Sequence, residues 1–103
     1  MEKIKCIYAI KDKRSDKVLY IGQTKDFKRR KNEHFKDIEQ PIDNFMLQNG
    51  RDNFEMYVLE EINEDISLNE IKNKENFYIN KFDTYNNGFN MYHSGNCTDE
   101  KSY

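Results

Sequence analysis

The sequence of 103 residues contains two cysteines, no tryptophan and a single proline. Two cysteines are too few for the disulfide framework that stabilises small secreted domains, so we expect a reducing, cytoplasmic compartment. The chain also lacks the run of about eighteen apolar residues that a membrane-spanning helix requires. Its first five residues lack the apolar centre of a signal peptide. We therefore expect one small cytoplasmic domain with no membrane partner.

A large excess of charge of one sign is also missing, since the net charge is −2. The charges are unevenly distributed, however. Residues 1–36 contain twelve basic and five acidic side chains, whereas residues 37–103 contain five basic and fourteen acidic ones. A basic first third is typical of a local surface that faces phosphate groups. The acidic remainder argues against tight, sequence-independent DNA binding by this domain alone.

Alternating apolar residues predict a strand over residues 3–10, with apolar side chains on both of its faces. Residues 11–17 contain no hydrophobic side chain and would connect this strand to a second one, over residues 18–24, as a hairpin. A loop centred near Arg14 would place Tyr8 opposite Tyr20 and Cys6 opposite Gly22. Because side chains alternate between the two faces, a slip of one residue would separate the two tyrosines.

The stretch from Val18 to Arg30 passes from a strand, through a glycine, into a basic helix. Gly22 has no Cβ, so a backbone or a phosphate group could approach it closely. Thr24 and Asp26 suit a helix N-terminus, where free N–H groups attract anions. This stretch therefore predicts a corner of the molecule that faces a polyanion.

The first helix is predicted over residues 26–38. Its inward stripe consists of Phe27, Lys31, His34, Phe35 and Ile38. Arg30 lies at the edge of this stripe and can face the sheet, whereas Arg29 points to the far side and is expected to be solvated.

Further elements follow the first helix. Pro41 can open a short helix that ends at Asn49-Gly50, and a third strand is predicted over residues 54–62. Ser67 and Glu70 have the spacing of a capping box, which predicts a third helix over residues 68–81. Residues from 83 onwards are expected to be irregular, with a turn at 86–88. The domain is expected to span residues 1–92, followed by a polar tail over 93–103.

Glu75 lies in the middle of the apolar stripe of the third helix. The other members of that stripe are Leu68, Ile71, Tyr78, Ile79 and Phe82. A carboxylate that faces the core costs several kcal/mol unless a partner compensates its charge. Two partners fit equally well: Arg30 in a buried ion pair, or a cation bound from outside. Together with Arg30, His34 and the two tyrosines, Glu75 predicts one polar pocket beside the sheet.

These residues carry a resemblance to a known family. The sequence resembles the GIY-YIG nuclease domain in Ile7-Tyr8, Leu19-Tyr20-Ile21-Gly22, Arg30, His34, Glu75 and Gly88-Phe89-Asn90. Several runs are similar to the catalytic domain of phage group I intron homing endonucleases: Lys25-Asp26-Phe27, His34-Phe35-Lys36-Asp37, Leu59-Glu60-Glu61-Ile62 and Glu75-Asn76-Phe77. Two features depart from the family pattern. Cys6 replaces the leading glycine of the first motif, and residues 40–44 lack a second histidine that some of these enzymes carry.

The resemblance implies an α+β fold, in which about three helices flank a three-stranded antiparallel sheet. It also implies an endonuclease that hydrolyses DNA phosphodiester bonds with a single Mg²⁺ or Mn²⁺ ion. Glu75 would be the metal ligand, and Tyr8 either the general base or the group that orients the attacking water. Tyr20 and His34 would position the water and the phosphate, Arg30 would stabilise the developing negative charge, and Asn90 would brace the site. The expected DNA contacts are Gly22, Lys25, Lys28 and Lys31.

The implied partner is double-stranded DNA. The segment that specifies the target in this family has no counterpart here, so specificity would come from another domain or a separate partner. The isolated domain is expected to be a monomer, in the host cytoplasm if a phage encodes it.

Within the nuclease interpretation, a repair nuclease, a small restriction enzyme and a homing catalytic domain all remain open. Two alternatives to a nuclease also remain open. A catalytically idle nucleic-acid-binding module could keep the same fold, although it would gain nothing from the cost of an inward Glu75. A zinc-stabilised module could use Cys6, His93 and Cys97, but these lack the paired spacing that is usual for zinc ligands.

Overall fold

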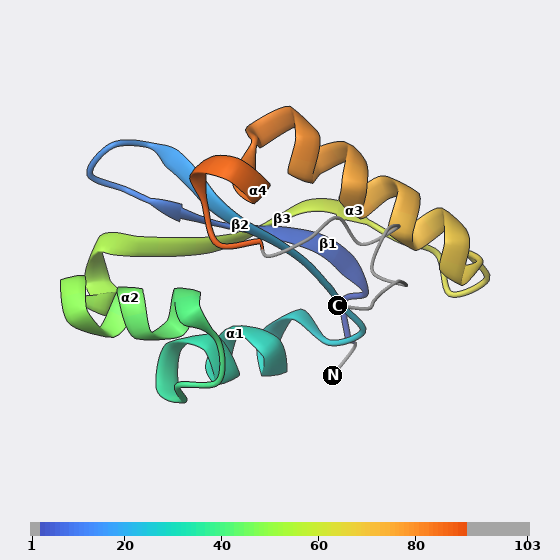
Figure 1. The fold of residues 1–103 in the computed structure, drawn as a ribbon. Helices are drawn as coiled ribbons and strands as arrows, with labels where there is room; N and C mark the ends of the chain where they lie inside the picture. Colours follow the sequence, from blue (N-terminus) through green and yellow to red (C-terminus); the bar gives the residue numbers. More distant parts are fainter. Residues whose placement is uncertain (1–2, 91–103) are drawn as a thin grey trace.

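The computed structural model of the chain describes residues 3–90. Its centre is a three-stranded antiparallel sheet with the strand order β2-β1-β3 (Figure 1). The strands are β1 (Cys6–Asp12), β2 (Lys17–Thr24) and β3 (Phe54–Glu61). The central strand β1 is buried at six of its seven residues, as expected for a strand covered on both faces. The predicted α+β class and the three-stranded antiparallel sheet are therefore confirmed.

The predicted pairing of β1 with β2 is wrong by two residues. Tyr8 lies opposite Gly22, and Ile10 lies opposite Tyr20. The register shifts between Ile10 and Lys11, where β2 accommodates an extra residue, an irregularity that the alternation of apolar residues does not reveal. Because an error of two residues preserves the face, Tyr8 and Tyr20 still share one side of the sheet, with ring centroids 6.3 Å apart.

The helices form a layer on each side of the sheet (Figure 1). The helices α1 (Phe27–Lys36) and α2 (Pro41–Asn49) cover one face, and a short 3-10 helix (Arg51–Asn53) leads from α2 into β3. The helices α3 (Leu68–Phe82) and α4 (Thr84–Asn87) cover the other face. Asp26 caps α1 by accepting the Arg29 N–H, and Ser67 caps α3 by accepting the Glu70 N–H.

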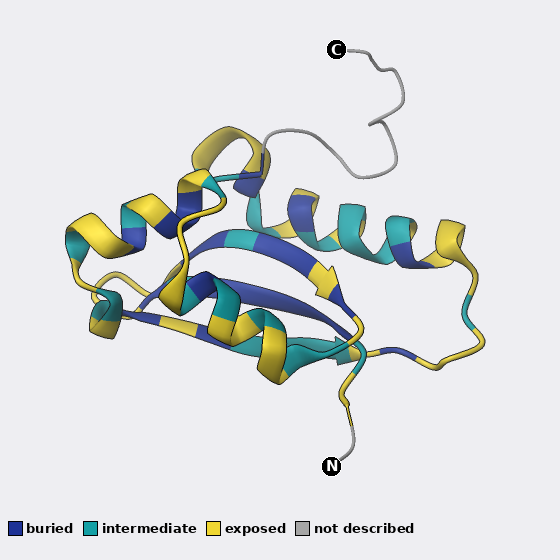
Figure 2. Ribbon diagram, turned by 90° about the horizontal axis from the view of Figure 1, so that it is seen from below, coloured by how far each residue is buried: buried dark blue, intermediate teal, exposed yellow. Residues whose placement is uncertain are grey.

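Two hydrophobic clusters lie on opposite faces of the sheet, and the buried segments of Figure 2 follow them. On the side of α1 and α2 the buried residues are Cys6, Tyr8, Ile10, Leu19, Ile42, Met46, Phe54 and Met56. On the side of α3 they are Ile7, Ala9, Val18, Ile21, Ile62, Ile71 and Ile79. Residues of α1 and residues of α3 thus reach the sheet from opposite faces.

Several details of the predicted helices need correction. The helix α1 ends at Lys36, so Ile38 lies beyond it and is 56% exposed. Lys31 is exposed rather than inward, and Leu68 at the start of α3 is 61% exposed. Residues 84–87 form the short helix α4 instead of part of an irregular segment, because Asp83 adopts the left-handed conformation that ends α3 and starts a new turn.

Among residues 3–90, no helix is long and apolar enough to cross a membrane. The predicted polar tail, with His93 and Cys97 of the zinc alternative, lies outside the described residues.

Candidate active site

The hydroxyl of Tyr8 and the imidazole of His34 form the centre of the site. Tyr8 Oη lies 2.9 Å from Nε2 of His34, and both side chains are buried. Tyr8 comes from the central strand and His34 from the inward face of α1, as their positions in the sequence predict. A hydrogen bond in a water-poor site is electrostatically strong, so this contact fixes both rings.

Tyr20 completes a cluster of three rings. Its centroid is 6.3 Å from that of Tyr8 and 5.6 Å from that of His34. Burial and then the neighbouring Tyr20 hold the pKa of Tyr8 far above its usual value, although the charge of Arg30 acts to lower it. Burial, followed by the carboxylate of Glu75, raises the pKa of Tyr20 to about 12. Both phenols are therefore neutral at neutral pH.

Asp43 is a member of the cluster that the sequence analysis missed. Its Oδ1 atom lies 2.5 Å from Nδ1 of His34, and its Oδ2 atom accepts the backbone N–H groups of Glu39 and Gln40 at 3.1 Å each. Asp43 is only 1% exposed. The sequence did contain one signal. Asp43 is the third residue after Gln40, which caps α2, and an acidic side chain at that position favours the first turn of a helix.

The imidazole of His34 has opposing influences on its charge. Burial lowers its pKa, whereas the hydrogen bond and the charge of Asp43 act to raise it. The net direction is a pKa below the ordinary value, since the ring is completely buried. His34 is thus held neutral between an aspartate and a tyrosine.

Gly22 lies directly against the phenol of Tyr8. A Cβ atom at this position would lie 2.4 Å from both Cζ and Oη of Tyr8. The close approach that the glycine was expected to permit is therefore made by an aromatic side chain, and Gly22 itself is buried. Its contact with DNA stays a prediction.

Arg30 faces the site, as predicted, and Arg29 faces solvent. Their side chains are 18% and 58% exposed. Arg30 pairs with Glu33 at 2.8 Å and with Glu39 at 3.7 Å, so its charge has compensation on its own side of the sheet. Burial opposes that charge, but the Glu33 hydrogen bond and the two tyrosines raise the pKa of Arg30 overall. Arg30 remains a cation at any pH of interest.

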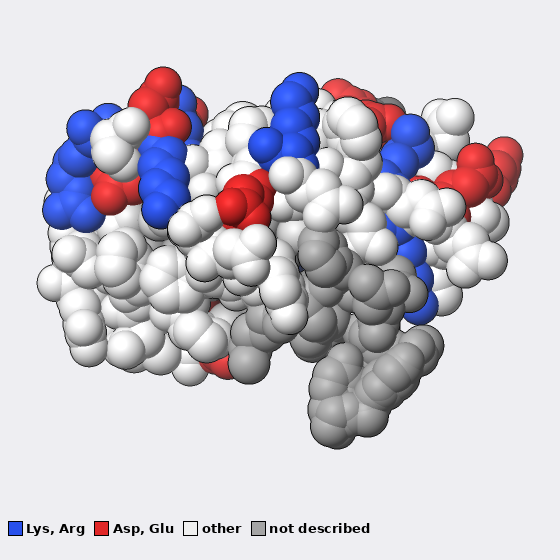
Figure 3. Space-filling model, turned by 45° about the horizontal axis from the view of Figure 1, so that its top comes forward, with Lys and Arg blue, Asp and Glu red and all other residues white. Residues whose placement is uncertain are grey.

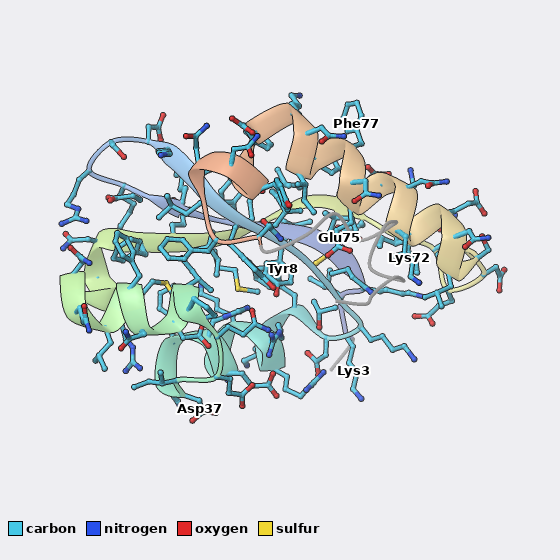
Figure 4. All side chains as sticks on the ribbon, viewed as in Figure 1. Lys3, Tyr8, Asp37, Lys72, Glu75 and Phe77 are labelled. Carbon is cyan, nitrogen blue, oxygen red and sulfur yellow. The ribbon has the colours of Figure 1, made fainter. Side chains whose placement is uncertain are left out.

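Glu75 approaches the cluster from the other side of the sheet. It lies on α3, and its half-buried side chain points from that helix toward the strands (Figure 4). Its carboxylate acts on the hydroxyls of both Tyr8 and Tyr20. The helix α3 that carries Glu75 covers the face of the sheet opposite α1, and the charge of Glu75 still acts on both tyrosine hydroxyls.

The acidic and histidine side chains set a limit on metal binding. Among residues 3–90, no group of three or more His, Cys, Asp or Glu side chains could hold a metal ion. A single carboxylate suits Mg²⁺, which prefers oxygen ligands and keeps several water molecules. The donor set of the described residues thus fits one hard divalent cation with most ligands from water and substrate, and residues 3–90 alone contain no closed zinc site.

Asn90 fastens the end of the described chain to β2. Its amide oxygen accepts the Ile21 N–H and its amide nitrogen donates to the Ile21 carbonyl, both at 2.9 Å. Phe89 N–H donates to the Leu19 carbonyl at 2.7 Å. These bonds occupy the outer edge of β2 between Tyr20 and Gly22. The hydrogen bonds of Asn90 to Ile21 are consistent with the bracing role, which stays a prediction.

The lysines expected to contact DNA are exposed on or just before α1: Lys25, Lys28 and Lys31. Acidic side chains lie among them, and Asp26, Glu33 and Asp37 share a shallow depression with Lys28 on this helix. On the face that Figure 3 presents, basic and acidic side chains also alternate instead of forming one basic surface. Their role in DNA binding stays a prediction.

The chain is similar to known proteins over most of its length. The profile of the GIY-YIG catalytic domain matches residues 4–90. The chain is 40% identical over 90 residues to intron-associated endonuclease 1 of Enterobacteria phage T4, a match that covers 82% of this chain and 36% of that protein. The chain thus spans about a third of the length of this curated relative.

Two solved structures have the same fold. One is the catalytic domain of the homing endonuclease I-TevI, with a TM-score of 0.73 and 31% identity over 85% of this chain and 98% of that one. The other is a variant of the intron endonuclease I-TevI catalytic domain in which a glutamate is replaced by alanine. It has a TM-score of 0.74 and 31% identity over 87% of this chain and 95% of that one.

Proposed function

Because the chain belongs to the GIY-YIG family of catalytic domains, we propose that it cleaves DNA as a divalent-metal-dependent endonuclease with a single-metal mechanism. It would be the catalytic part of a homing-type or other mobile-element nuclease. The reaction is hydrolysis of a phosphodiester bond, in which water attacks phosphorus and a sugar oxygen leaves. Such a site needs a group that activates water, a cation for the phosphate and an anion that holds the metal.

The observation that supports this proposal is the meeting of opposite charges at Tyr20. The charge of Glu75, on α3, raises the pKa of the Tyr20 hydroxyl, and the charge of Arg30, on α1, lowers it, so an anionic and a cationic side chain both lie near this phenol. The positive charge of Arg30 suits a phosphate group, and the negative charge of Glu75 suits a metal ion.

The residues of the chain have separate tasks in this scheme. Arg30 would bind a phosphate oxygen and stabilise the negative charge that develops there, for which a planar guanidinium is well suited. Tyr8 would take the proton of the attacking water, and Tyr20 would orient that water and the phosphate. Asn90 would hold β2 so that Tyr20 and Gly22 keep their positions.

Glu75 is the residue that would hold the metal. Its carboxylate is half-buried and lies within electrostatic reach of both tyrosines. A bound Mg²⁺ or Mn²⁺ ion would supply positive charge that polarises the phosphate and favours deprotonation of a nearby hydroxyl or water.

The substrate would be double-stranded DNA, and its sequence would be recognised outside this domain. The chain covers only 36% of the curated phage relative, and its surface carries mixed charges that favour weak binding. We expect a monomer that works in the host cytoplasm, with a further DNA-binding segment or partner. The alternative is a catalytically idle module that only binds nucleic acid.

The deciding experiment is cleavage of supercoiled plasmid DNA with Mg²⁺, with Mn²⁺ and with EDTA. We expect nicked or linear product with either metal and none with EDTA. Glu75→Gln should abolish cleavage. Glu64→Gln, at an exposed residue in the loop between β3 and α3, should cut like wild type. Equal cleavage by Glu75→Gln would refute the metal assignment. Absence of cleavage with any divalent metal would favour the idle module.

A further inference from the structure

We propose that Asp43 is a positioning residue that fixes the tautomer of His34, so that His34 accepts the hydroxyl proton of Tyr8 through Nε2. The value of this arrangement for catalysis rests on the proposed nuclease function. The arrangement itself rests only on the geometry of three buried side chains. The proposal adds Asp43 to the site, a residue that is not among the family motif residues named in the sequence analysis.

The orientation of the Asp43 carboxylate is fixed by the backbone. Oδ2 accepts two N–H groups, from Glu39 and Gln40, each at 3.1 Å. Oδ1 is then left to face Nδ1 of His34 at 2.5 Å. An ionised carboxylate accepts hydrogen bonds and donates none, so Nδ1 must carry the hydrogen of this contact.

The other nitrogen of the ring follows from this assignment. A neutral imidazole carries one hydrogen, so Nε2 keeps a free electron pair when Nδ1 is protonated. Nε2 lies 2.9 Å from Tyr8 Oη, and the tyrosine hydroxyl therefore donates. The opposite tautomer would place the electron pair of Nδ1 against a carboxylate oxygen at 2.5 Å, which is repulsive.

This direction of hydrogen bonding supplies what a tyrosine base lacks. Tyr8 is 1% exposed and its pKa is held far above the usual value, so it needs an acceptor at hand to lose its proton. When the proton moves from Oη to Nε2, a phenolate forms near Arg30 and an imidazolium forms against Asp43. The phenolate then takes a proton from the attacking water. After the products leave, Nε2–H returns its proton to Tyr8 Oη while the tyrosine hydroxyl gives its own proton to water in the emptied site, which restores both residues.

The tautomer can be measured directly in the free protein. Nitrogen-15 NMR of the imidazole distinguishes a protonated Nδ1 from a protonated Nε2 and from the doubly protonated ring. The chain has two histidines, so the His93→Gln variant leaves the signals of His34 alone. At pH 7.5, without metal or DNA, we expect Nδ1–H with a bare Nε2. The Nε2–H tautomer, or a doubly protonated ring, would overturn the proposal.

The variant Asp43→Asn tests the cause. Its amide oxygen should replace Oδ2 as the acceptor of the Glu39 and Gln40 N–H groups, which leaves the NH₂ group facing Nδ1. An NH₂ donor requires a bare Nδ1, so we expect the hydrogen of His34 to move to Nε2. In plasmid cleavage the kcat should fall at least ten-fold with little change in KM. An unchanged tautomer and kcat would overturn the role of Asp43.

Asp52→Asn, at an exposed aspartate of the 3-10 helix, is the matched control and should alter neither readout. If Asp43→Asn fails to fold, the wild-type tautomer still decides the proposal. The two proposals also fail separately. A wild-type protein with Nδ1–H that never cuts DNA would refute the nuclease function and leave the position of the proton established.

Discussion

Gly22 and Tyr8 lie opposite each other on neighbouring strands, and the missing side chain of the glycine leaves the space that the phenol of the tyrosine fills. The site depends on this contact, because the Tyr8 hydroxyl must also stay 2.9 Å from His34 Nε2. A glycine in the middle of a strand normally weakens it. Here the weakening is compensated by the position it gives to Tyr8.

The substitution Gly22→Ala should therefore damage both stability and activity. The added Cβ would lie 2.4 Å from Cζ and Oη of Tyr8, and that ring is buried. Overpacking of this kind costs about 1–3 kcal/mol. Urea unfolding should show that loss, and plasmid cleavage should fall by at least ten-fold. Gln23→Ala, at the exposed neighbouring residue, is the control. Wild-type stability in Gly22→Ala would contradict the contact.

The adjacent arginines allow a comparison in which charge is kept equal. Arg30→Ala removes a half-buried guanidinium next to the tyrosines and should lower cleavage by about 10²–10³-fold, the usual loss for one transition-state donor. Arg29→Ala removes the same charge from the preceding residue, whose side chain is exposed, and should change cleavage little. Steady-state cleavage of a short DNA duplex measures both. Equal losses would indicate a general charge effect instead of a role at the site.

Local patterns predicted most of the elements, because each depends on neighbouring residues. The helix ends at Asp26, Gly50 and Ser67 are examples, since capping residues satisfy backbone groups a few positions away. The shared face of Tyr8 and Tyr20 was also predicted, although the predicted register was wrong by two residues. Alternation fixes the face of a strand, whereas the register depends on a bulge beside the hairpin.

The site was harder to predict wherever it depends on how helices are placed. Helical periodicity predicted that His34 and Glu75 both face inward, but it does not say which side of the sheet each helix covers. Their helices lie on opposite faces. Asp43 was missed because its environment comes from the fold: the turn between α1 and α2 brings its carboxylate to His34, nine residues away.

The hydrogen bonds between Asn90 and Ile21 predict a local effect on β2. Asn90→Ala removes an acceptor and a donor that hold the two backbone groups of Ile21. We expect a loss of about 1–3 kcal/mol and faster exchange of the Ile21 amide hydrogen. Hydrogen-exchange NMR of β2 measures this directly. Asn86→Ala, at an exposed amide bound only to the Asp83 side chain nearby, is the control. Unchanged exchange at Ile21 would refute the bracing role.

The buried imidazole of His34 predicts how stability depends on pH. Burial lowers its pKa in the folded protein, whereas the unfolded chain should have the ordinary value near 6.5. The unfolded state therefore binds more protons as the pH falls below about 6.5, and the free energy of unfolding decreases by up to about 1.4 kcal/mol per pH unit. The contribution is complete above pH 6.5 and is lost as the pH approaches the folded value.

Urea unfolding at pH 7.5, 6.5, 5.5 and 5.0 tests this dependence, because it measures how the free energy of unfolding changes with pH. The carboxylates whose pKa values are lowered, Asp12, Glu33 and Glu60, lose their contribution only below their ordinary range near pH 4, so they do not obscure the window above 5. His34→Gln should flatten the dependence there, and His93→Gln should leave the His34 contribution in place. A free energy of unfolding that rises as the pH falls through 6.5 would mean that folding favours the charged imidazole, contrary to the burial of the ring between Tyr8 and Asp43.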